Sequence, residues 1–344
     1  MGHQVSSVYA THLISQGTIL LNDGNRMPMI SFDTIEKIDK ADQVVKPAVI
    51  EAIEAGYRQI DTAPIYENEE YIGEAIIDVI NRGIVRREEL WITSKLQTDL
   101  GTREGVLESL QAALKRFKLD YVDLYLIQTP DNIMQFVGNS FVNPTQTGIN
   151  LQTTLNLPEY DILDIWKGME DVKKLNLTRS IGVANFNSTH INRILANSET
   201  IPAANEIEVN PMYANLELVA YCQSLNITVL SYAPFGFMVP RPFSLYPVET
   251  SFQEPILVQL ALKYGKIPSQ IVLRYLIDRG TVPIPRSNNG THIHTNIDVF
   301  DFQLTPDEIY SINELNRNVK VYIFEGESFD AILAYYGFEM EKIN

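Results

Sequence analysis

Cysteine is almost absent from this sequence: the 344 residues contain one, Cys222. A single cysteine excludes an internal disulfide framework and any metal cluster that is built on cysteines. The chain also lacks an apolar run long enough to span a membrane, and its first residues lack the apolar core of a secretory signal. From these absences we predict a cytoplasmic protein that makes no membrane contact.

Positive charge is scarce as well, because 27 Lys and Arg residues stand against 43 Asp and Glu residues, which gives a net charge of −16. This balance opposes binding to nucleic acid, so any anionic ligand must be bound by a local group of residues. The sequence has no Gly-x-Gly-x-x-Gly fingerprint, which argues against a Rossmann dehydrogenase. None of the five histidines follows a predicted strand beside carboxylates, so no metal site is predicted.

Short β-branched runs alternate with amphipathic segments along nearly the whole chain, which is typical of repeated βα units around a parallel sheet. A closed (β/α)₈ TIM barrel buries every such strand on both faces, and we predict this α/β fold as a single domain over residues 1–344. An open doubly wound sheet is the alternative. The predicted strands are Met27–Phe32, Arg58–Asp61, Leu90–Ser94, Val122–Ile127, Ser180–Val183, Glu206–Val209, Thr228–Ser231 and Val282–Ile284.

Helical patterns follow these strands, and several further segments surround them. The predicted helices are Glu67–Asn81, Arg103–Phe117, Tyr160–Leu175, Thr189–Ala196, Leu216–Ser224, Glu254–Tyr264, Pro268–Asp278 and Thr291–Phe300. Two alternating runs around an Asn-Asp-Gly turn predict a β-hairpin at about 11–26 that covers the bottom of the barrel. Long loops are expected at about 129–158 and 235–255 over the carboxyl-terminal face, with an aromatic tail at 319–344.

Polar residues follow three of the predicted strands, and their chemistry is compatible with reduction of a carbonyl group. A carbonyl that accepts hydride becomes an alkoxide and needs a proton donor, which the hydroxyl of Tyr66 can be if its pKa is lowered. An ammonium at Lys95 favours the phenolate, and a carboxylate at Asp61 keeps that lysine charged and oriented. Gln128 ends the fourth apolar run, and its amide can donate a hydrogen bond to a carbonyl but cannot titrate.

Seven stretches in the same order resemble the aldo-keto reductase family, over roughly Met27 to Asn318. They are GYRQIDTAPIYENEEYIGEAI, LWITSKLQTD, SIGVANFN, NEIEVNP, LSYAPFG, PIPRSNN and VFDFQLT. The resemblance implies a monomeric reductase that uses NADP(H) and a small-molecule carbonyl substrate, with Asp61, Tyr66 and Lys95 as catalytic residues. It also implies that Gln128 stands where the family has a catalytic histidine.

The resemblance carries the family's nicotinamide site onto this sequence with some departures. Tyr232 matches the aromatic residue that stacks on the nicotinamide, and Asn185 matches an amide that binds its carboxamide. Glu206 stands where the family has Gln, Ala184 where it has Ser, and Asp33 where it has Gly. An ionised Glu206 can accept a hydrogen bond from the carboxamide but cannot donate one. The other residues expected to contact the cofactor there are Thr34, Ala233 and Phe235.

At the adenine end, the stretch PIPRSNNGTHIHTN resembles the family's phosphate-binding strand and the start of a helix. Arg286 suits the 2′-phosphate of NADP because a guanidinium pairs with phosphate through two hydrogen bonds. Ser287 and the helix N-terminus add donors. His292 stands where an arginine usually stacks on adenine, and Asn296 is retained. NADP is therefore expected in preference to NAD.

Two functions from different classes remain open. The first is a reductase for a bulky hydrophobic carbonyl such as a steroid, whose substrate would contact Ile35, Trp91, Thr129 and Phe237. Reduction of a steroid double bond is a minor variant of it. The second is a barrel that binds a cofactor or ligand but has lost catalysis, as the departures above suggest. A triose-type isomerase with Glu206 as its base is a remote third.

Overall fold

The protein's structure, a computed structural model, describes residues 17–36, 41–97, 100–130, 135–137, 140–142, 161–239 and 251–321. Its centre is a sheet of eight parallel strands in the order β3-β4-β5-β6-β9-β10-β11-β12. The strands are β3 Phe32–Asp33, β4 Gln59–Asp61, β5 Trp91–Lys95, β6 Val122–Ile127, β9 Thr178–Ala184, β10 Ala204–Glu208, β11 Thr228–Tyr232 and β12 Thr281–Pro283.

The first and last strands of this order close the sheet into a barrel. The backbone N–H groups of Ser31 and Asp33 donate to the carbonyl oxygens of Pro283 and Pro285 at 3.0 and 3.1 Å. These hydrogen bonds satisfy the edge of β3 with the segment around β12. The predicted (β/α)₈ barrel is therefore confirmed, and the open doubly wound sheet is wrong.

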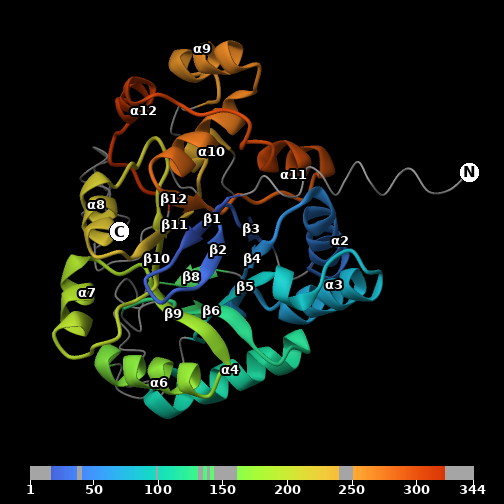
Figure 1. Ribbon diagram of the computed structural model, residues 1–344, viewed down its shortest axis with the longest axis vertical. Coiled ribbons are helices and arrows are strands. Elements are labelled where there is room, and N and C mark those ends of the chain that lie inside the picture. Colours follow the sequence, from blue (N-terminus) through green and yellow to red (C-terminus); the bar gives the residue numbers. More distant parts are fainter. Residues whose placement is uncertain are drawn as a thin grey trace, which may run out of the picture.

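Helices surround the barrel, as Figure 1 shows. They are α2 Ala41–Ala55, α3 Glu69–Asn81, α4 Arg103–Phe117, α6 Ile162–Lys174, α7 Ser188–Leu195, α8 Leu216–Ser224, α9 Pro255–Tyr264, α10 Pro268–Asp278, α11 Gly290–Ile297 and α12 Pro306–Asn313. Helix α4 shows how the local sequence forms such a helix. The Thr102 side chain accepts a hydrogen bond from Gly105 N at the start of the helix. Its apolar residues Val106, Leu110 and Phe117 face the sheet.

Each strand alternates between two apolar environments, and β6 shows this most clearly. Leu124 and Leu126 belong to the cluster inside the barrel, whereas Tyr125 and Ile127 pack under the helices. Because side chains in a strand alternate with a period of two, the next inward position after Leu126 is Gln128. The sequence of β6 therefore directs Gln128 toward the barrel axis at the carboxyl end.

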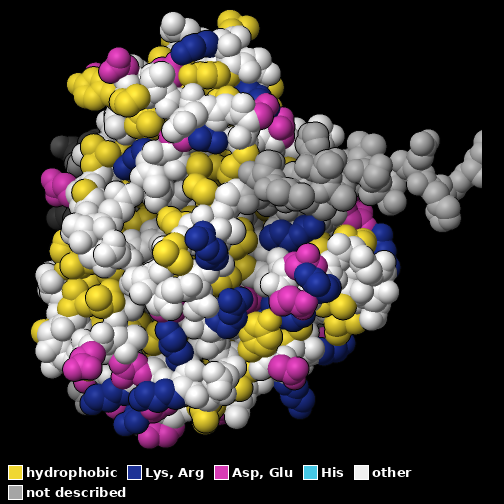
Figure 2. Space-filling model, viewed as in Figure 1, with side chains coloured by type: hydrophobic (Ala, Val, Ile, Leu, Met, Phe, Trp, Pro, Cys, Tyr) yellow, Lys and Arg dark blue, Asp and Glu magenta, His cyan; other side chains and the backbone are white. Residues whose placement is uncertain are grey.

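The hairpin closes the opposite end of the barrel, in front of the sheet in Figure 1. Strand β1 Thr18–Leu20 pairs with β2 Arg26–Pro28, and Leu21 and Met27 enter the interior cluster. Asn25 Nδ2 donates to Ser180 Oγ near the start of β9 at 3.1 Å. A hairpin at the bottom was predicted and is present, but it extends to Pro28, and residues 11–16 of the predicted range lie outside the described residues. Lys and Arg side chains are interspersed with Asp and Glu on this face (Figure 2).

Some predicted elements differ from the structure. The first predicted strand, Met27–Phe32, is divided between β2 and β3. Helices α2 and α12 and a short antiparallel pair, β7 Gln135–Val137 with β8 Ser140–Val142, were not predicted. Helix α2 contains Pro47, which normally interrupts a helical pattern. The tail after residue 321 and most of the two long loops lie outside the described residues.

Candidate active site

The carboxyl ends of the eight barrel strands bring together most of the predicted site residues. The residues just before them on the same strand face, such as Leu126, Leu230 and Ile284, lie in the interior cluster. By the two-residue repeat of a strand, the end residues share that inward direction. They are Asp33, Asp61, Lys95, Gln128, Ala184, Tyr232 and Arg286, and Glu206, two residues before the end of β10, shares their direction.

A buried charge cluster forms the centre of this mouth. Lys95 Nζ lies 2.6 Å from Asp61 Oδ1 and 3.2 Å from Glu206 Oε1. It also donates to the carbonyl oxygen of Thr62 at 3.2 Å. All three charged side chains are at most 5 % exposed, so water screens them weakly. The structure thus joins Glu206, which we expected beside the nicotinamide, to the catalytic pair.

More negative than positive charge surrounds this lysine. Burial alone would lower the pKa of Lys95, but Asp61 and Glu206 outweigh it and raise that pKa, so the ammonium stays charged. Burial and the neighbouring Glu206 raise the pKa of Asp61 well above its ordinary value. Asp61 Oδ2 and Glu206 Oε2 are both buried and accept no hydrogen bond from a described donor. The cluster thus holds two buried carboxyl groups against one ammonium.

Asp33 is the third carboxylate at this mouth. Burial, with a further contribution from Asp61, raises the pKa of Asp33 to about 6. Its Oδ1 accepts from Ile35 N at 2.9 Å. Between about pH 4 and pH 6 the folded protein thus holds a proton that the unfolded chain has lost, so stability falls as the pH rises through this window.

Replacement of Asp33 by asparagine is therefore expected to stabilise the protein at pH 7.5, by about 3 kcal/mol on the scale of 1.36 kcal/mol per unit of pKa shift. The gain should shrink toward zero below pH 4, where aspartate is protonated in both states. Urea unfolding from pH 3.5 to 8 measures this. Asp120→Asn, which removes an exposed carboxylate, controls for net charge. A constant difference across the range would contradict the assignment.

Three predicted residues form a hydrogen-bonded chain beside the charge cluster. Asn185 Nδ2 donates to the backbone oxygen of Gln128 at 3.0 Å, and Tyr232 Oη donates to Asn185 Oδ1 at 2.9 Å. Asn185 has a φ of 63°, a conformation that asparagine tolerates better than most residues. This backbone turn holds the amide between β6 and β11, while the neighbouring Ala184 is buried.

Tyr66 and Thr34 lie on the segments that follow β4 and β3. Tyr66 ends the 3₁₀ helix η3 Pro64–Tyr66, and its backbone N–H donates to Ala63 O at 3.0 Å. Lys95 bonds the carbonyl of Thr62 at the start of the same segment, so the lysine supports the turn that carries Tyr66. The hydroxyl of Thr34 donates to the backbone oxygen of Asp61 at 2.9 Å. Thr34 thus holds the strand that carries the carboxylate.

The adenine-end residues lie on and after β12. Ser287 Oγ accepts from Asn289 N at 3.1 Å, and the Asn289 side chain caps α11. Within α11, His292 is exposed and Asn296 is buried. Arg286 forms an ion pair with Glu36, a residue that the sequence did not single out. The pair joins the segment after β3 to the segment after β12, and these two segments are neighbours only because the barrel closes.

The four expected substrate residues are not all at the mouth. Trp91 begins β5 and lies in the interior cluster under the hairpin, with the Arg179 guanidinium 5.4 Å from its ring centroid. The prediction that Trp91 contacts substrate is therefore wrong, since the amino ends of the strands lie opposite the mouth. Ile35 and Thr129 directly follow strand ends, as expected.

The segment after β11 carries the remaining predicted residues. Ala233 has a φ of 47° and is buried. Phe235 is also buried and meets Phe252 edge to face, with ring centroids 5.4 Å apart. Phe237 lies in the 3₁₀ helix η7 Gly236–Met238 and is partly exposed. Phe235 thus fixes the loop, whereas Phe237 remains accessible to a ligand.

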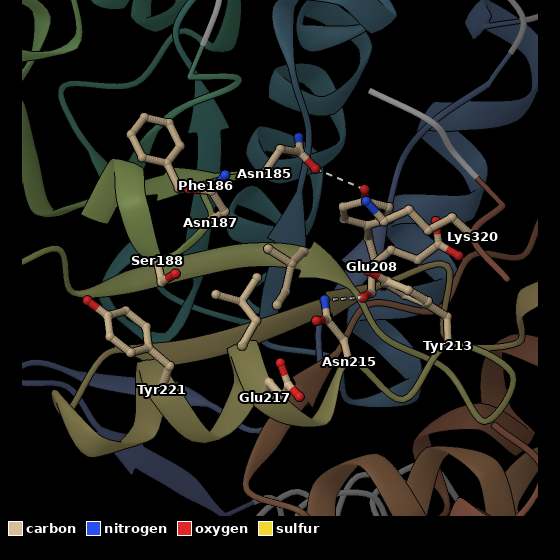
Figure 3. A pocket seen from close by; sticks show the side chains of 13 residues that line it. Asn185, Phe186, Asn187, Ser188, Glu208, Tyr213, Asn215, Glu217, Tyr221 and Lys320 are labelled. Carbon is tan, nitrogen blue, oxygen red and sulfur yellow. Dashed lines mark hydrogen bonds between the residues drawn. The ribbon is translucent and has the colours of Figure 1, made fainter. Parts of the chain in front are cut away.

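A cavity of about 470 Å³ adjoins Asn185 and Tyr232, the residues that are expected to contact the nicotinamide (Figure 3). Asn185 and Tyr232 form one part of its wall, and residues of α8 and the segment before it form another, with Tyr213 and Tyr221 among them. Glu208 and Lys320 add charges of opposite sign. The cavity is large enough for part of a small molecule.

A metal-binding group or a membrane-spanning helix would indicate a different class of protein. No group of three or more His, Cys, Asp or Glu residues in the described part of the chain is arranged to hold a metal ion. No helix among the described residues has both the length and the apolar character needed to cross a membrane.

Comparison with known proteins gives a consistent result. Residues 17–317 match the family model described as the aldo/keto reductase family. Aldo-keto reductase AKR2E4 of Bombyx mori is 46% identical over 307 residues, which cover 88% of this chain and 93% of that protein. Prostaglandin F synthase 1 of Bos taurus is 34% identical over 311 residues, covering 89% and 94% of the two chains.

Solved structures agree with the sequence matches. The crystal structure of Bombyx mori AKR2E4 in complex with NADP has a TM-score of 0.79 and 43% identity, and the match covers 94% of this chain and 97% of that one. The crystal structure of aldo-keto reductase AKR2E5 complexed with NADPH also has a TM-score of 0.79, with 34% identity and 90% of each chain covered.

Proposed function

Because the chain belongs to the aldo/keto reductase family, we propose that it is an NADPH-dependent oxidoreductase that reduces an aldehyde or a ketone. The observation that carries this proposal is the buried Lys95–Asp61 ion pair at 2.6 Å, at the mouth of the barrel and beside the turn of Tyr66. A buried pair costs desolvation and is weak support for a purely stabilising role. Its position at the strand ends, where barrel enzymes carry their chemistry, favours a catalytic one.

The residues present fit a nicotinamide dinucleotide. Tyr232 and Asn185 are hydrogen-bonded to each other at the mouth, and the buried Glu206 Oε2, which accepts from no described donor, can accept from the N–H of the carboxamide. Arg286, Ser287 and the N-terminus of α11 supply donors for phosphate at the other end. When bound, NADPH would supply the hydride.

Tyr66 is proposed as the proton donor to the developing alkoxide. Lys95 favours the phenolate that remains, and Asp61 keeps the lysine charged. Glu206 places a second carboxyl group 3.2 Å from Lys95, and negative charge there disfavours the phenolate. Glu206 is thus proposed to tune the pKa of Tyr66 through Lys95.

Gln128 is proposed to orient the substrate carbonyl without transferring a proton. It is buried at the mouth, and its backbone oxygen is already fixed by Asn185. The family resemblance implies a histidine at this position, whose imidazole would assist proton delivery. The protein is therefore proposed to reduce ordinary aldehydes slowly.

Substitution of Gln128 by histidine is expected to raise kcat about tenfold, because an imidazole adds a titrating group beside Tyr66. Steady-state kinetics with one aldehyde from pH 5 to 9 measures the change. Gln128→Leu keeps the backbone contact with Asn185 and removes the amide, so it should lower kcat. No gain for the histidine variant at any pH would count against this account of the site.

The proposed function is tested with NADPH and a panel of aldehydes and ketones that includes bulky apolar compounds. Tyr66→Phe should lower kcat by about 100-fold or more, the usual range for a general acid, while NADPH binding measured by calorimetry stays within about twofold. Tyr121→Phe, a tyrosine outside the mouth under Arg87, is the matched control. Equal activity of Tyr66→Phe and the wild type would refute the assignment.

The substrate is proposed to be a bulky hydrophobic carbonyl compound. The partly exposed Phe237 supports this, as does the similarity to a prostaglandin F synthase. The expected monomeric state and cytoplasmic location stay predictions.

A second candidate is a protein that binds cofactor but does not reduce. The surplus of buried carboxylates around Lys95 favours it, since added negative charge opposes formation of the Tyr66 phenolate. It predicts NADPH binding with no turnover that depends on Tyr66. The panel above separates the two candidates.

A further inference from the structure

The proposed phosphate-binding arginine already holds a carboxylate of the same chain. Arg286 Nη2 and Glu36 Oε2 form a close ion pair, and the same oxygen lies 3.4 Å from Asn288 Nδ2. The Glu36 side chain is 12 % exposed and the Arg286 side chain 36 %, so the carboxylate is the more enclosed partner. Glu36 thus occupies the guanidinium from the protein side.

Closure of the barrel holds these two residues together. Asp33 N donates to Pro285 O at 3.1 Å. Pro285 directly precedes Arg286, and Asp33 precedes Glu36 by three residues. Asp33 itself lies near enough to Arg286 for the guanidinium to act against the rise in the pKa of Asp33. Glu36 therefore pairs directly with the guanidinium after β12, while Asp33 at the end of β3 feels its charge.

The contact differs in location from two other arginine ion pairs of the protein. Arg82 joins α3 to Glu54 on the neighbouring helix α2, and Arg274 pairs with Asp278 one turn later in α10. Those pairs link helices or turns. The Glu36 pair instead lies at the carboxyl ends of the barrel strands, beside Ser287 and the start of α11, where phosphate donors converge.

We propose that Glu36 is a specificity-determining residue: its carboxylate binds Arg286 in the free protein and competes with the 2′-phosphate of NADPH. This inference rests on the proposed function only in taking Arg286 as the phosphate-binding residue. A 2′-phosphate must displace Glu36 and then stays beside a like charge, whereas NADH, which lacks this phosphate, meets no such competition. The preference for NADPH over NADH is thereby reduced.

Glu36→Gln keeps the size of the side chain and removes the charge. Calorimetric titration is carried out on wild type and variant with NADPH, NADH, 2′,5′-ADP and 5′-AMP. The variant is expected to bind NADPH and 2′,5′-ADP about five- to tenfold more tightly, with NADH and 5′-AMP changed by less than about twofold. Because 2′,5′-ADP has no nicotinamide, its gain assigns the effect to the adenine end.

Two further variants control the experiment. Glu54→Gln removes a carboxylate that also pairs with an arginine, but on α2, and should leave all four affinities unchanged. In an Arg286→Gln background, Glu36→Gln should no longer change the affinities for NADPH and 2′,5′-ADP more than those for NADH and 5′-AMP. Equal tightening of all four ligands would show that Glu36 merely obstructs the site, and no change or a weakening would show that it does not compete; each result overturns the inference.

The outcome is separable from that of the proposed function. Suppose that Glu36→Gln changes only the affinities for the two ligands with a 2′-phosphate, while Tyr66→Phe reduces carbonyls as fast as the wild type. The reductase proposal then fails and the role of Glu36 stands. If Tyr66→Phe loses activity but the ratio of NADPH to NADH affinity is the same in the Glu36→Gln variant, the inference fails and the reductase stands.

Discussion

Replacement of Lys95 by methionine is expected to lower the free energy of unfolding by about 3–5 kcal/mol at pH 7.5 and to abolish carbonyl reduction. The methionine fills a similar volume but leaves Asp61 and Glu206 buried without their cation. Without the cation, the pKa of Asp61 rises further above its ordinary value, so the folded variant holds a proton that the unfolded chain loses. The deficit in stability should therefore grow as the pH rises from 5 to 8, in the direction opposite to ordinary acid denaturation.

Urea unfolding across that pH range measures the effect. Lys173→Met is the matched control, because Lys173 pairs with Asp23 at 2.8 Å and its side chain is 31 % exposed. Removal of such a partly exposed pair should cost only about 1 kcal/mol. Combining Lys95→Met with Glu206→Gln should recover part of the lost stability but none of the activity. Equal stability of Lys95→Met and the wild type would exclude the proposed charge cluster.

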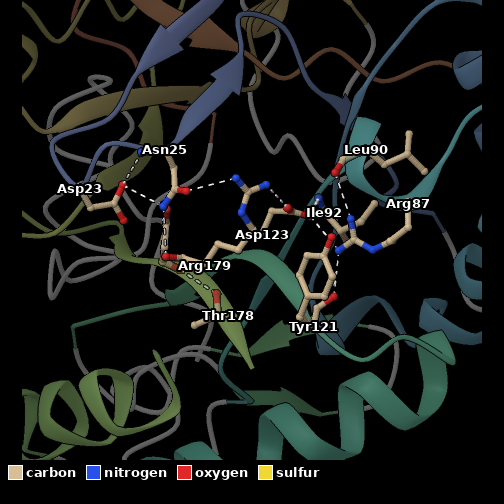
Figure 4. Close-up of polar contacts among 10 residues, drawn as sticks. Asp23, Asn25, Arg87, Leu90, Ile92, Tyr121, Asp123, Thr178 and Arg179 are labelled. Atoms are coloured by element: carbon tan, nitrogen blue, oxygen red, sulfur yellow. Dashed lines mark hydrogen bonds and ion pairs between the residues drawn. The ribbon is translucent and has the colours of Figure 1, made fainter. Parts of the chain in front are cut away.

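Replacement of Asp123 by alanine is expected to destabilise the barrel as strongly, by about 3–5 kcal/mol, without a direct effect on the mouth. Asp123 is fully buried near the amino end of β6 (Figure 4). Its oxygens accept from Arg87 Nη2 at 2.8 Å, from Arg179 Nη1 at 3.0 Å and from Ile92 N at 2.9 Å. Alanine leaves two cations and a backbone donor without this acceptor.

Asp123→Asn should cost less, because its amide oxygen still accepts from Ile92 N. Asp171→Ala removes the carboxylate of the more exposed pair with Arg103 and should cost about 1 kcal/mol or less. Urea denaturation compares the three variants. The activity that remains below the unfolding transition should be that of the wild type, since Asp123 lies at the bottom of the barrel. A cost below about 1 kcal/mol for Asp123→Ala would mean that the arginines find other partners.

The buried charge clusters around Asp123 and around Lys95 lie at opposite ends of the barrel and differ in their charge balance. At the bottom, Asp123 is matched by two arginines, so its charge is fully compensated. At the mouth, one lysine faces Asp61, Glu206 and, farther away, Asp33. Uncompensated buried charge raises the energy of the folded state. Its restriction to the mouth fits a site that holds a proton and binds a ligand.

The strand and helix pattern can be read from the sequence because each element carries its own period. The run VDLYLI of β6 places Leu124 and Leu126 inside the barrel, and the same two-residue repeat points Gln128 inward. The error at Trp91 was avoidable on the same grounds. It begins its strand, and only residues at the carboxyl end of a strand reach the mouth.

By itself, the sequence determined the repeated βα order, the hairpin, the inward direction of the strand ends and the family. Local periodicity and order along the chain suffice for these. Only the tertiary structure decided which charges meet: that Glu206 joins Lys95 and Asp61, and that Glu36 holds Arg286. Such pairs depend on the closure of the barrel and on the angle of each strand end around its axis. These are properties of all eight strands together, and no single segment encodes them.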